Sequence, residues 1–429
     1  MKDELVALLA GVEAGRVTST RGQVTFIYND EWREAPNSYP LSLSLPLSVK
    51  EHGPAARGRE FSAIESFLWG LLPDNELVLD KWAKKFHVSA RNVFALLAHV
   101  GEDCAGAVQF VPPERVDDIR SGEQDKIEWL GEHELAERLR ALREDHTAWR
   151  LPGDTGQFSL AGAQPKTAML YMDGRWGIPS GRTATTHIIK PPTGQFDGHA
   201  ENEHFCLALA RALGLPAAQS QVMRFENEVA IVIERYDRQL QGNDILRVHQ
   251  EDVCQALGVP PSQKYQNERG PGVSDIVELL RTHSSDSGTD VDTFIRAVGL
   301  NWLIGGTDAH AKNYSLLITS GPRVRLAPLY DVASILPYDF DLKKAKFAMK
   351  IGGEYGFDQI GKRQWEKCAV ELKIDPARLI PDLREMAISL PDALTAEHKQ
   401  ARKEGLEHGI IDRLAERITK RSQECAALL

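Results

Sequence analysis

The pattern of apolar and polar positions predicts strands and short helices over the first hundred residues. Apolar and polar residues alternate from Gly15 to Tyr28 around a short turn, which indicates a β-hairpin. Helical spacing and one further apolar segment then predict two helices and a strand, at 63–72, 91–100 and 108–111. Residues 1–110 are therefore expected to form a small α/β subdomain.

The middle of the chain combines a charged helix with two apolar strands. The charged segment 132–145 has helical spacing, so residues 111–150 are expected to form a helical connector. Strands are predicted at 186–190 and 229–234, with an amphipathic helix between them at 202–213. Gly214 and Pro216 end that helix.

The last third of the chain is predicted to be mainly helical. An apolar helix over 294–304 is broken by Gly305 and Gly306, and two short strands follow on either side of a turn at 320–322. The remaining helices are expected at 363–372, 376–390, 391–403 and 410–428.

Composition and charge narrow the class of protein. The 429 residues are 42% apolar and 26% charged, which suits a globular chain of two or three domains. The net charge of −10 argues against a protein that coats nucleic acid by itself. No apolar run approaches membrane-spanning length, the first residues are acidic, and the five cysteines are scattered without a C-x-x-C motif. We therefore expect a cytoplasmic protein with no membrane partner.

The stretch from Asn301 to Asp331 is the most informative about chemistry. Asp308 and Asn313 are five residues apart, as the catalytic-loop Asp and Asn of protein kinases are, and Asp331 follows a predicted hairpin. Phosphoryl transfer needs an acidic group that accepts the nucleophile's proton and hard oxygen ligands that hold Mg²⁺. An Asx-rich turn between a helix and a hairpin would use the same residue types, so the spacing alone leaves both interpretations open.

A second polar stretch, Gln157 to Met169, has the composition of a phosphate-binding loop. Small residues precede Lys166, and small residues let backbone N–H groups approach phosphate oxygens while a lysine adds charge. The Walker A sequence is absent, and Pro165 removes one potential donor. A plain β-turn is equally compatible with these residues.

Two further residues, Lys190 and Glu203, are candidates for the same nucleotide-binding site. Lys190 ends a predicted strand, like the strand lysine that contacts the α- and β-phosphates in kinases, although a solvated strand end explains it more simply. Glu203 is a candidate partner for Lys190, and its place near the start of a helix also suits the helix dipole. The strand 229–234 leads into a segment where an interlobe hinge would offer backbone groups to adenine.

Nine stretches of the chain, in order over roughly residues 15–350, carry a resemblance to a known family. They are G-L-L-P-D-N (70–75), G-E-D-C-A-G-A-V-Q-F (101–110), F-S-L-A-G-A-Q-P-K-T-A (158–168), T-T-H-I-I-K-P (185–191), E-R-Y-D-R (234–238), H-Q-E-D-V-C-Q-A-L-G (249–258), K-Y-Q-N-E-R-G-P-G (264–272), G-G-T-D-A-H-A-K-N-Y-S (305–315) and L-Y-D-V-A-S (329–334). Together they resemble the HipA-type toxins, serine/threonine kinases of bacterial toxin–antitoxin modules. The stretch 248–272 adds no chemistry that its residues define by themselves.

The resemblance implies an α/β fold that is two-lobed and protein-kinase-like (PI3/4-kinase-like), with a β-rich N-terminal subdomain and an all-helical C-terminal lobe. Residues 151–245 would form the nucleotide-binding N-lobe, and residues 246–429 the mostly helical catalytic C-lobe.

The resemblance also implies roles for individual residues. Asp308 would be the catalytic base, and Asn313 and Asp331 would hold Mg²⁺. ATP would be bound by Ala161, Gly162, Ala163, Gln164, Pro165, Lys166, Lys190, Glu234, Arg235, Tyr236, His310, Ala311, Lys312, Asn313, Tyr330 and Asp331. Ser159 matches the serine that HipA-type kinases autophosphorylate, and a phosphoserine there would repel ATP phosphates and displace the loop.

The partners that the family implies are a HipB-type helix-turn-helix antitoxin, operator DNA reached through the antitoxin complex, and a protein substrate. The substrate class is an aminoacyl-tRNA synthetase, of which glutamyl-tRNA synthetase is the best known, so that translation and growth stop (persistence). Basic residues of the last helix would suit DNA phosphates, although a solvated bundle face is as compatible with them: Arg413, Arg417, Lys420 and Arg421.

Two rival functions stay open on sequence. The first is a small-molecule phosphotransferase of related fold, because no arginine-rich activation segment follows Asp331. The second is a non-catalytic corepressor that joins an antitoxin on DNA. The presence of Asp308, Asn313 and Lys190 together with Asp331 disfavours this second function.

Overall fold

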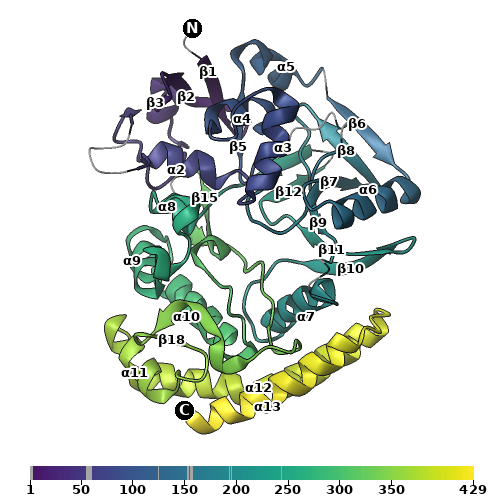
Figure 1. Ribbon diagram of the computed structural model, residues 1–429. Coiled ribbons are helices and arrows are strands. Elements are labelled where there is room, and N and C mark those ends of the chain that lie inside the picture. Colours follow the sequence, from purple (N-terminus) through teal and green to yellow (C-terminus); the bar gives the residue numbers. More distant parts are fainter. Residues whose placement is uncertain are drawn as a thin grey trace.

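The chain folds into two lobes and an N-terminal subdomain that packs against both. The computed structural model describes residues 3–54, 60–123, 125–151, 154, 158–192, 194, 196–242, 244–321 and 323–429. Figure 1 shows the N-terminal subdomain at the top, the strand-rich lobe beside it, and the helices of the C-terminal lobe below. The segment 305–331 lies where these parts meet, since Lys312 contacts Asp74 of the N-terminal subdomain and Asp331 contacts Lys190 of the strand-rich lobe.

A five-stranded antiparallel sheet in the order β4-β3-β2-β1-β5 forms the base of the N-terminal subdomain. Its elements are β1 (Asp3–Leu9), β2 (Val12–Thr20), β3 (Gln23–Tyr28), α1 (Asp30–Glu34), β4 (Glu51–His52), α2 (Ala63–Gly70), α3 (Glu76–Phe86), α4 (Val93–Val100) and β5 (Val108–Val111). The predicted hairpin is confirmed, because Gly15 pairs with Tyr28 and Thr20 with Gln23. Arg21 and Gly22 in the turn have positive φ, which matches the twist of a tight hairpin.

The pattern of alternation does not predict β1. Every residue from Leu5 to Leu9 is apolar and buried, so both faces of this strand are covered. A strand covered on both faces loses the alternation that identifies a half-exposed strand. The flanking β2 and β5 supply its hydrogen-bond partners: β2 follows in a tight hairpin, whereas β5 lies about a hundred residues further along the chain and is brought to β1 by the tertiary fold.

A six-stranded sheet in the order β10-β11-β9-β7-β8-β6 forms the core of the N-lobe. The chain enters it through η1 (Pro113–Arg115) and α5 (Val116–Ser121), and the elements of the lobe are β6 (Lys126–Leu130), α6 (Glu132–Glu144), β7 (Thr167–Met172), β8 (Arg175–Ser180), β9 (His187–Lys190), α7 (His199–Ala212), β10 (Ser220–Phe225) and β11 (Glu228–Glu234). The expected strands that end in Lys190 and Glu234 are both present, and they pair with each other.

The sequence pattern predicted that residues 111–150 form a helical connector. The expected helix is present as α6, but the segment as a whole is not a helical connector. Part of this segment forms β6, which pairs with β8 at the edge of the N-lobe sheet. Leu135 and Leu139 of α6 pack against Met169 and Val232 of the same sheet. Residues 126–144 are therefore part of the N-lobe, because the apolar face of α6 is buried on its sheet, whereas Val116 and Ile119 of α5 pack against β1 and β5 of the N-terminal subdomain.

The two faces of the N-lobe sheet are covered by different helices. Ala230 and Val232 of β11 pack with α6, whereas Ile231 and Ile233 pack with Ala200 of α7. Successive residues of a strand point to opposite faces, so α6 and α7 lie on opposite sides. Lys190 pairs directly with Ile231, which places the lysine on the face that α7 covers.

The C-lobe is mostly helical and also contains small sheets. Its elements are β12 (Arg238–Gln241), β13 (Asp244–Arg247), β14 (His249–Asp252), α8 (Val253–Ala256), η2 (Pro261–Gln263), η3 (Gln266–Glu268), α9 (Val273–His283), α10 (Ser287–Ile304), η4 (Ala311–Asn313), β15 (Ser315–Thr319), β16 (Arg323–Leu326), η5 (Leu342–Lys344), β17 (Lys346–Ile351), β18 (Glu354–Gly356), α11 (Lys362–Glu371), α12 (Pro376–Lys403) and α13 (Gly409–Leu428). The strands β17 and β18 interrupt a C-terminal region that was expected to be all-helical.

A single helix, α12, replaces the two helices expected at 376–390 and 391–403. Pro391 lies inside this helix, where it removes one backbone donor without ending the helix. Leu383, Leu390 and Leu394 continue one buried stripe across the proline. The packing of this stripe against neighbouring helices outweighs the local cost of the proline. Among the residues that the structure describes, no helix has both the length and the apolar character needed to cross a membrane.

Candidate active site

The loop after α10 is shaped by two glycines. Gly305 caps the helix in the left-handed region, and a Cβ on Gly306 would lie 2.2 Å from Asn301 Oδ1. Asp308 lies in the exposed part of the loop that follows. The carbonyl of Asp308 accepts hydrogen bonds from His310 N (2.8 Å) and from Asn313 Nδ2 (3.1 Å). These bonds fix the backbone of Asp308 and orient the amide of Asn313 toward it.

The side chain of Asp308 has a partner that the sequence pattern did not identify. Tyr265 donates its hydroxyl hydrogen bond to Asp308 Oδ1 at 2.7 Å. The ring of Tyr265 packs edge-on against the ring of His310, with the centroids 4.9 Å apart. The only sequence signal for Tyr265 was its membership of one family-like stretch, 264–272.

Lys190 connects the two lobes through a pair of carboxylates. Its ammonium lies 2.8 Å from Glu203 Oε1 of α7 and 2.8 Å from Asp331 Oδ1 of the C-lobe. Burial disfavours the charge on Lys190, but the two carboxylates outweigh burial and raise the pKa of this lysine. The alternative of a solvated strand end is therefore wrong, and the suggested pairing with Glu203 is confirmed.

Asp331 lies where the C-lobe contacts Lys190 of the N-lobe. Its side chain is 42% exposed, and its φ of 57° lies in the left-handed region, which Asp tolerates better than most residues. Desolvation opposes ionisation, but the ammonium groups of Lys190 and Lys166 outweigh it and hold the pKa of Asp331 well below its usual range. The carboxylate is thus ionised and accessible.

The loop before β7 is held by its own lysine and by the N-terminal subdomain. Lys166 Nζ donates to Ala161 O at 2.7 Å and closes a small loop around Gly162, whose φ is 99°. A Cβ on Gly162 would lie 2.6 Å from Lys166 Nζ, so only glycine fits there. The carbonyl of Gly162 accepts from Asp74 N at 3.0 Å. This contact joins the loop to the N-terminal subdomain.

The remaining residues of this loop form its rim. Ala163 is exposed, Gln164 is half-buried and Pro165 is buried. Gln164 Nε2 lies 3.5 Å from His199 Nδ1 at the start of α7. Burial and the charge of Lys190 lower the pKa of Lys166 to about 8.

The predicted hinge contains an exposed residue, Glu234, followed by a buried one, Arg235. Glu234 is exposed, and its backbone N–H donates to Gln219 O. The guanidinium of Arg235 is buried, where it donates to Asp237, to Thr185 Oγ1 and to Cys104 O, so only the backbone of Arg235 remains for a nucleotide. This guanidinium ties the hinge to the N-terminal subdomain.

An aromatic pair lies beside the hinge. The rings of Tyr236 and Tyr330 are 5.9 Å apart and pack with Ile231 and Ile233 on the face that carries Lys190. The hydroxyl of Tyr330 donates to Lys312 O at 2.7 Å. Apolar side chains and aromatic rings beside a buried lysine form a surface suited to a flat purine.

Comparison with known proteins identifies the family. Residues 5–111 match the HipA N-terminal domain, and residues 158–394 match the HipA-like C-terminal domain. The chain belongs to the HipA family. The protein Y4mE of Sinorhizobium fredii is 38% identical over 391 residues, which cover 89% of this chain and 88% of that protein.

Two further comparisons concern a protein from another organism. The serine/threonine-protein kinase toxin HipA of Shewanella oneidensis is 31% identical over 386 residues, covering 86% of this chain and 82% of that protein. A solved complex of HipA, HipB and operator DNA from the same organism contains a chain that superposes with a TM-score of 0.82 at 25% identity. The superposition covers 99% of this chain and 98% of that one. This protein is therefore a kinase of the HipA toxin type with the two-lobed kinase-like fold.

Ser159 of this HipA-family kinase is completely buried. Its hydroxyl donates to Leu71 O at 2.7 Å, and its backbone N–H donates to Asp103 O at 3.0 Å. Both acceptors belong to the N-terminal subdomain. The predicted phosphate-binding loop begins at Gln157, which lies outside the described residues, and Ser159 in its described part is docked on the N-terminal subdomain.

Lys312 anchors the loop that follows Asp308 to two neighbouring carboxylates. The ammonium of Lys312 lies 2.9 Å from Asp252 Oδ2 and 3.7 Å from Asp74 Oδ1, so its charge is balanced by these carboxylates. Ala311 is fully buried, and burial lowers the pKa of the adjacent His310. These contacts of Lys312 point to a structural task, and its predicted contact with the nucleotide stays a prediction.

The residues expected to hold a metal have suitable donor atoms. No group of three or more His, Cys, Asp or Glu residues within the described ranges is arranged as a metal site. A kinase magnesium site needs fewer protein ligands, because phosphate oxygens and water complete the octahedron. The amide N–H of Asn313 donates to Asp308 O, so the amide oxygen remains available to coordinate a metal. The carboxylate of Asp331 is exposed. The two side chains fit a hard cation.

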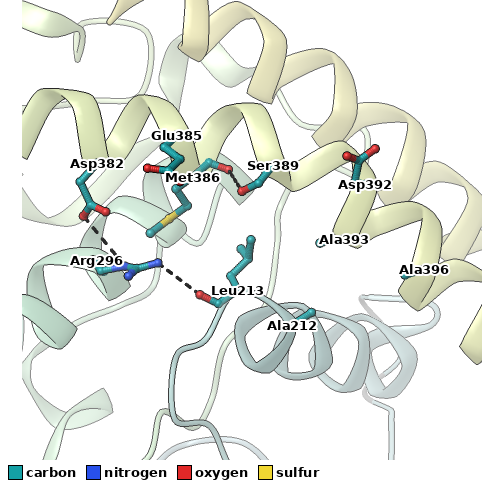
Figure 2. Close-up of a pocket in the computed structure, with 10 residues that line it drawn as sticks. All are labelled: Ala212, Leu213, Arg296, Asp382, Glu385, Met386, Ser389, Asp392, Ala393 and Ala396. Atoms are coloured by element: carbon teal, nitrogen blue, oxygen red, sulfur yellow. Dashed lines mark hydrogen bonds and ion pairs between the residues drawn. The ribbon is translucent and has the colours of Figure 1, made fainter.

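A pocket of about 590 Å³ lies away from these residues. It is formed by the end of α7, by α10 and by α12, and Figure 2 shows Arg296 between Asp382 and the carbonyl of Leu213. Arg296 Nη2 donates to Leu213 O at 3.2 Å, and its Nε lies 3.9 Å from Asp382 Oδ2. None of the predicted site residues lines this pocket.

Proposed function

We propose that this HipA-family kinase binds ATP with Mg²⁺ in the cleft between the lobes and transfers the γ-phosphoryl group to a serine of a protein. The observation that carries the proposal is the Lys190–Asp331 contact, which joins the phosphate-binding lysine to the metal-binding carboxylate at 2.8 Å across the cleft. Lys166 and Lys190 supply positive charge for phosphate oxygens, and Asn313 and Asp331 supply oxygen ligands for the metal. Asp308 lies in the exposed loop where the acceptor hydroxyl would approach.

The decisive assay uses γ-labelled ATP and Mg²⁺ with the full-length chain. Asp308→Ala and Asp331→Ala should each reduce phosphate transfer by at least about a hundredfold, since one accepts the proton and the other holds the metal. Circular dichroism and the melting temperature of both variants should stay close to those of the wild type. Phosphate transfer at the wild-type rate by either variant would show that these residues do not carry the reaction.

Self-phosphorylation of Ser159 is the regulatory part of the proposal. The Ser159 oxygen would attack the γ-phosphorus, ADP would leave, and the proton would pass to Asp308. The hydroxyl is buried against Leu71 O, so the loop must leave its docked position before Ser159 can react. Intact-protein and peptide mass spectrometry should find one phosphate on Ser159 in the wild type and none in Asp308→Ala. Phosphate on Ser159 of the Asp308→Ala protein would contradict this route.

The proposed partners follow from the family. We propose an aminoacyl-tRNA synthetase, of the glutamyl-tRNA synthetase type, as the substrate, with a HipB-type antitoxin that carries the complex to operator DNA. The similarity to a HipA chain solved with HipB and operator DNA supports the last two. A phosphoproteome after induced expression, compared with an Asp308→Ala control, should reveal a phosphoserine in a synthetase. If the synthetases stay unmodified while other proteins gain phosphate, the proposed substrate class is wrong.

A further inference from the structure

Tyr265 is the side chain that determines how the carboxylate of Asp308 is presented. Asp308 is exposed, and an exposed carboxylate rotates freely unless a partner holds it. The hydroxyl of Tyr265 donates to Oδ1 at 2.7 Å, which is a short bond to a charged acceptor. With Oδ1 engaged, Oδ2 is the oxygen left to accept the proton of an incoming hydroxyl.

Several contacts hold the ring of Tyr265 in turn. The ring meets His310 edge-on, and Lys264 Nζ lies 5.6 Å from its centroid. The same ammonium lies 3.0 Å from Asp74 Oδ2, and the backbone of Asp74 donates to the carbonyl of Gly162. Burial and the adjacent Asp308 raise the pKa of Tyr265, so its hydroxyl remains a donor at any physiological pH.

These contacts form a chain of direct interactions from the phosphate loop to the catalytic loop. Gly162, Asp74, Lys264, Tyr265 and Asp308 follow one another, each joined to the next by a hydrogen bond, an ion pair or the peptide bond. The N-terminal subdomain contributes Asp74, which joins the loop at Gly162 to Lys264. Loop docking and the orientation of Asp308 therefore share a physical connection.

We propose that Tyr265 is a positioning residue for phosphoryl transfer, which fixes the Asp308 carboxylate so that Oδ2 faces the acceptor hydroxyl. The inference rests on the proposed role of Asp308 as the base. Tyr265 is uncharged and does not attract the phosphates of ATP. Its contribution is therefore expected in the rate of phosphoryl transfer and not in the affinity for ATP. Misplacing a catalytic group by about 1 Å can cost about a hundredfold in rate.

Tyr265→Phe is the test, because it removes the hydroxyl and keeps the ring that contacts His310. We expect kcat for consumption of labelled ATP to fall about 10- to 100-fold, with KM for ATP and the melting temperature unchanged. Tyr355→Phe is the matched control. Tyr355 on β18 also has a lysine over its ring, with Lys350 Nζ at 5.1 Å, and its hydroxyl bonds to none of the described catalytic residues.

The outcomes separate this inference from the proposed function. A Tyr265→Phe enzyme with wild-type kcat, or one whose KM alone rises, would overturn the positioning role while Asp308→Ala remains inactive. A faster Tyr265→Phe enzyme would also overturn it, since the hydroxyl would then compete with the acceptor. Activity in Asp308→Ala would instead refute the proposed function itself. A purely structural role for the ring predicts no loss in Tyr265→Phe and a melting-temperature loss in Tyr265→Ala.

Discussion

Lys190 Nζ lies 2.8 Å from Glu203 Oε1, and this contact joins strand β9 to helix α7. Glu203 is completely buried, so it holds the lysine from the protein side while Asp331 holds it from the cleft. The lysine is therefore placed before any nucleotide arrives. Without Glu203, Asp331 would be the remaining carboxylate in contact with this ammonium.

Glu203→Gln should weaken ATP turnover about 10- to 100-fold. A hydrogen bond to a charged group contributes about 1.5–3 kcal/mol, and Lys190 would move toward Asp331 and compete with the metal there. Steady-state kinetics over a range of ATP concentrations measures the effect. Glu201→Gln, a change at another buried glutamate of α7, is the control and should stay near the wild type. Equal losses in both variants would show that the helix, and not the ion pair, was damaged.

ATP affinity should fall as the pH rises through about 8. Lys166 is charged below its pKa of about 8 and neutral above it, and only the charged form attracts phosphate oxygens. Calorimetric titration between pH 7 and 9.5 should show this loss of ATP affinity. The phosphates of bound ATP favour the charged lysine, so they should raise the pKa of Lys166 in the complex. Lys166→Arg keeps its charge throughout this range and should remove the dependence. A wild-type profile that stays flat would mean that Lys166 does not contact phosphate.

Ser159→Asp should undock the phosphate loop without any phosphorylation. The hydroxyl site is closed and faces Leu71 O, so a carboxylate there meets a carbonyl oxygen and no water. We expect at least about a tenfold loss of ATP affinity and faster hydrogen exchange over 158–166. Ser159→Ala loses one hydrogen bond, about 1 kcal/mol, and should keep the loop docked.

The control for this substitution is Ser320→Asp, which places the same charge in an exposed turn. It should change neither the affinity nor the exchange. Slow exchange over the loop in Ser159→Asp would show that charge at this position does not release it.

Glu251→Gln should stabilise the protein, and more so at pH 8.5 than at pH 5. Burial raises the pKa of Glu251 to about 8, while its backbone partner Leu43 N donates to Oε1 at 2.8 Å. The protonated acid is favoured in the folded state, so its contribution is complete below about pH 4.5 and is lost as the pH rises through 8. Gln resembles the protonated form at every pH. The gain should reach about 2–4 kcal/mol, at about 1.4 kcal/mol for each unit of pKa difference.

Thermal unfolding of both proteins across this pH range measures the difference. Glu354→Gln on exposed β18 should show no pH-dependent gain. A constant difference between wild type and Glu251→Gln from pH 5 to 8.5 would show that Glu251 does not titrate in this window.

Much of the local structure could be predicted from the sequence. The hairpin from Gly15 to Tyr28, the strand that ends in Lys190 and the helix before Gly305 depend on alternation, turn residues and caps, which act over a few positions. The order and spacing of Asp308, Asn313 and Asp331 suited phosphoryl transfer but also an Asx-rich turn, and the family resemblance of the surrounding stretches favoured the kinase. Chemical type and local spacing are properties that the chain carries before it folds.

Tertiary structure decided the features that depend on residues far apart. Strand β1 is apolar on both faces because neighbours cover both, and α12 continues through Pro391 because its buried stripe packs on other helices. Residues 126–144 belong to the N-lobe for the same reason, since β6 pairs with β8 and the apolar face of α6 is buried on the sheet. A local window contains none of these partners, so it cannot weigh their burial against local propensity.

Distant partners also determined the geometry of the candidate site, which local sequence could not show. The sequence by itself determined which residue types could accept a proton, hold a metal or bind phosphate. Only the folded chain decided that Tyr265 bonds Asp308, that Lys312 is balanced by Asp252, and that Lys190 lies between two carboxylates. Such pairs are separated by 13 to 141 positions along the chain, and the orientation of each charge is determined by packing that no short segment specifies.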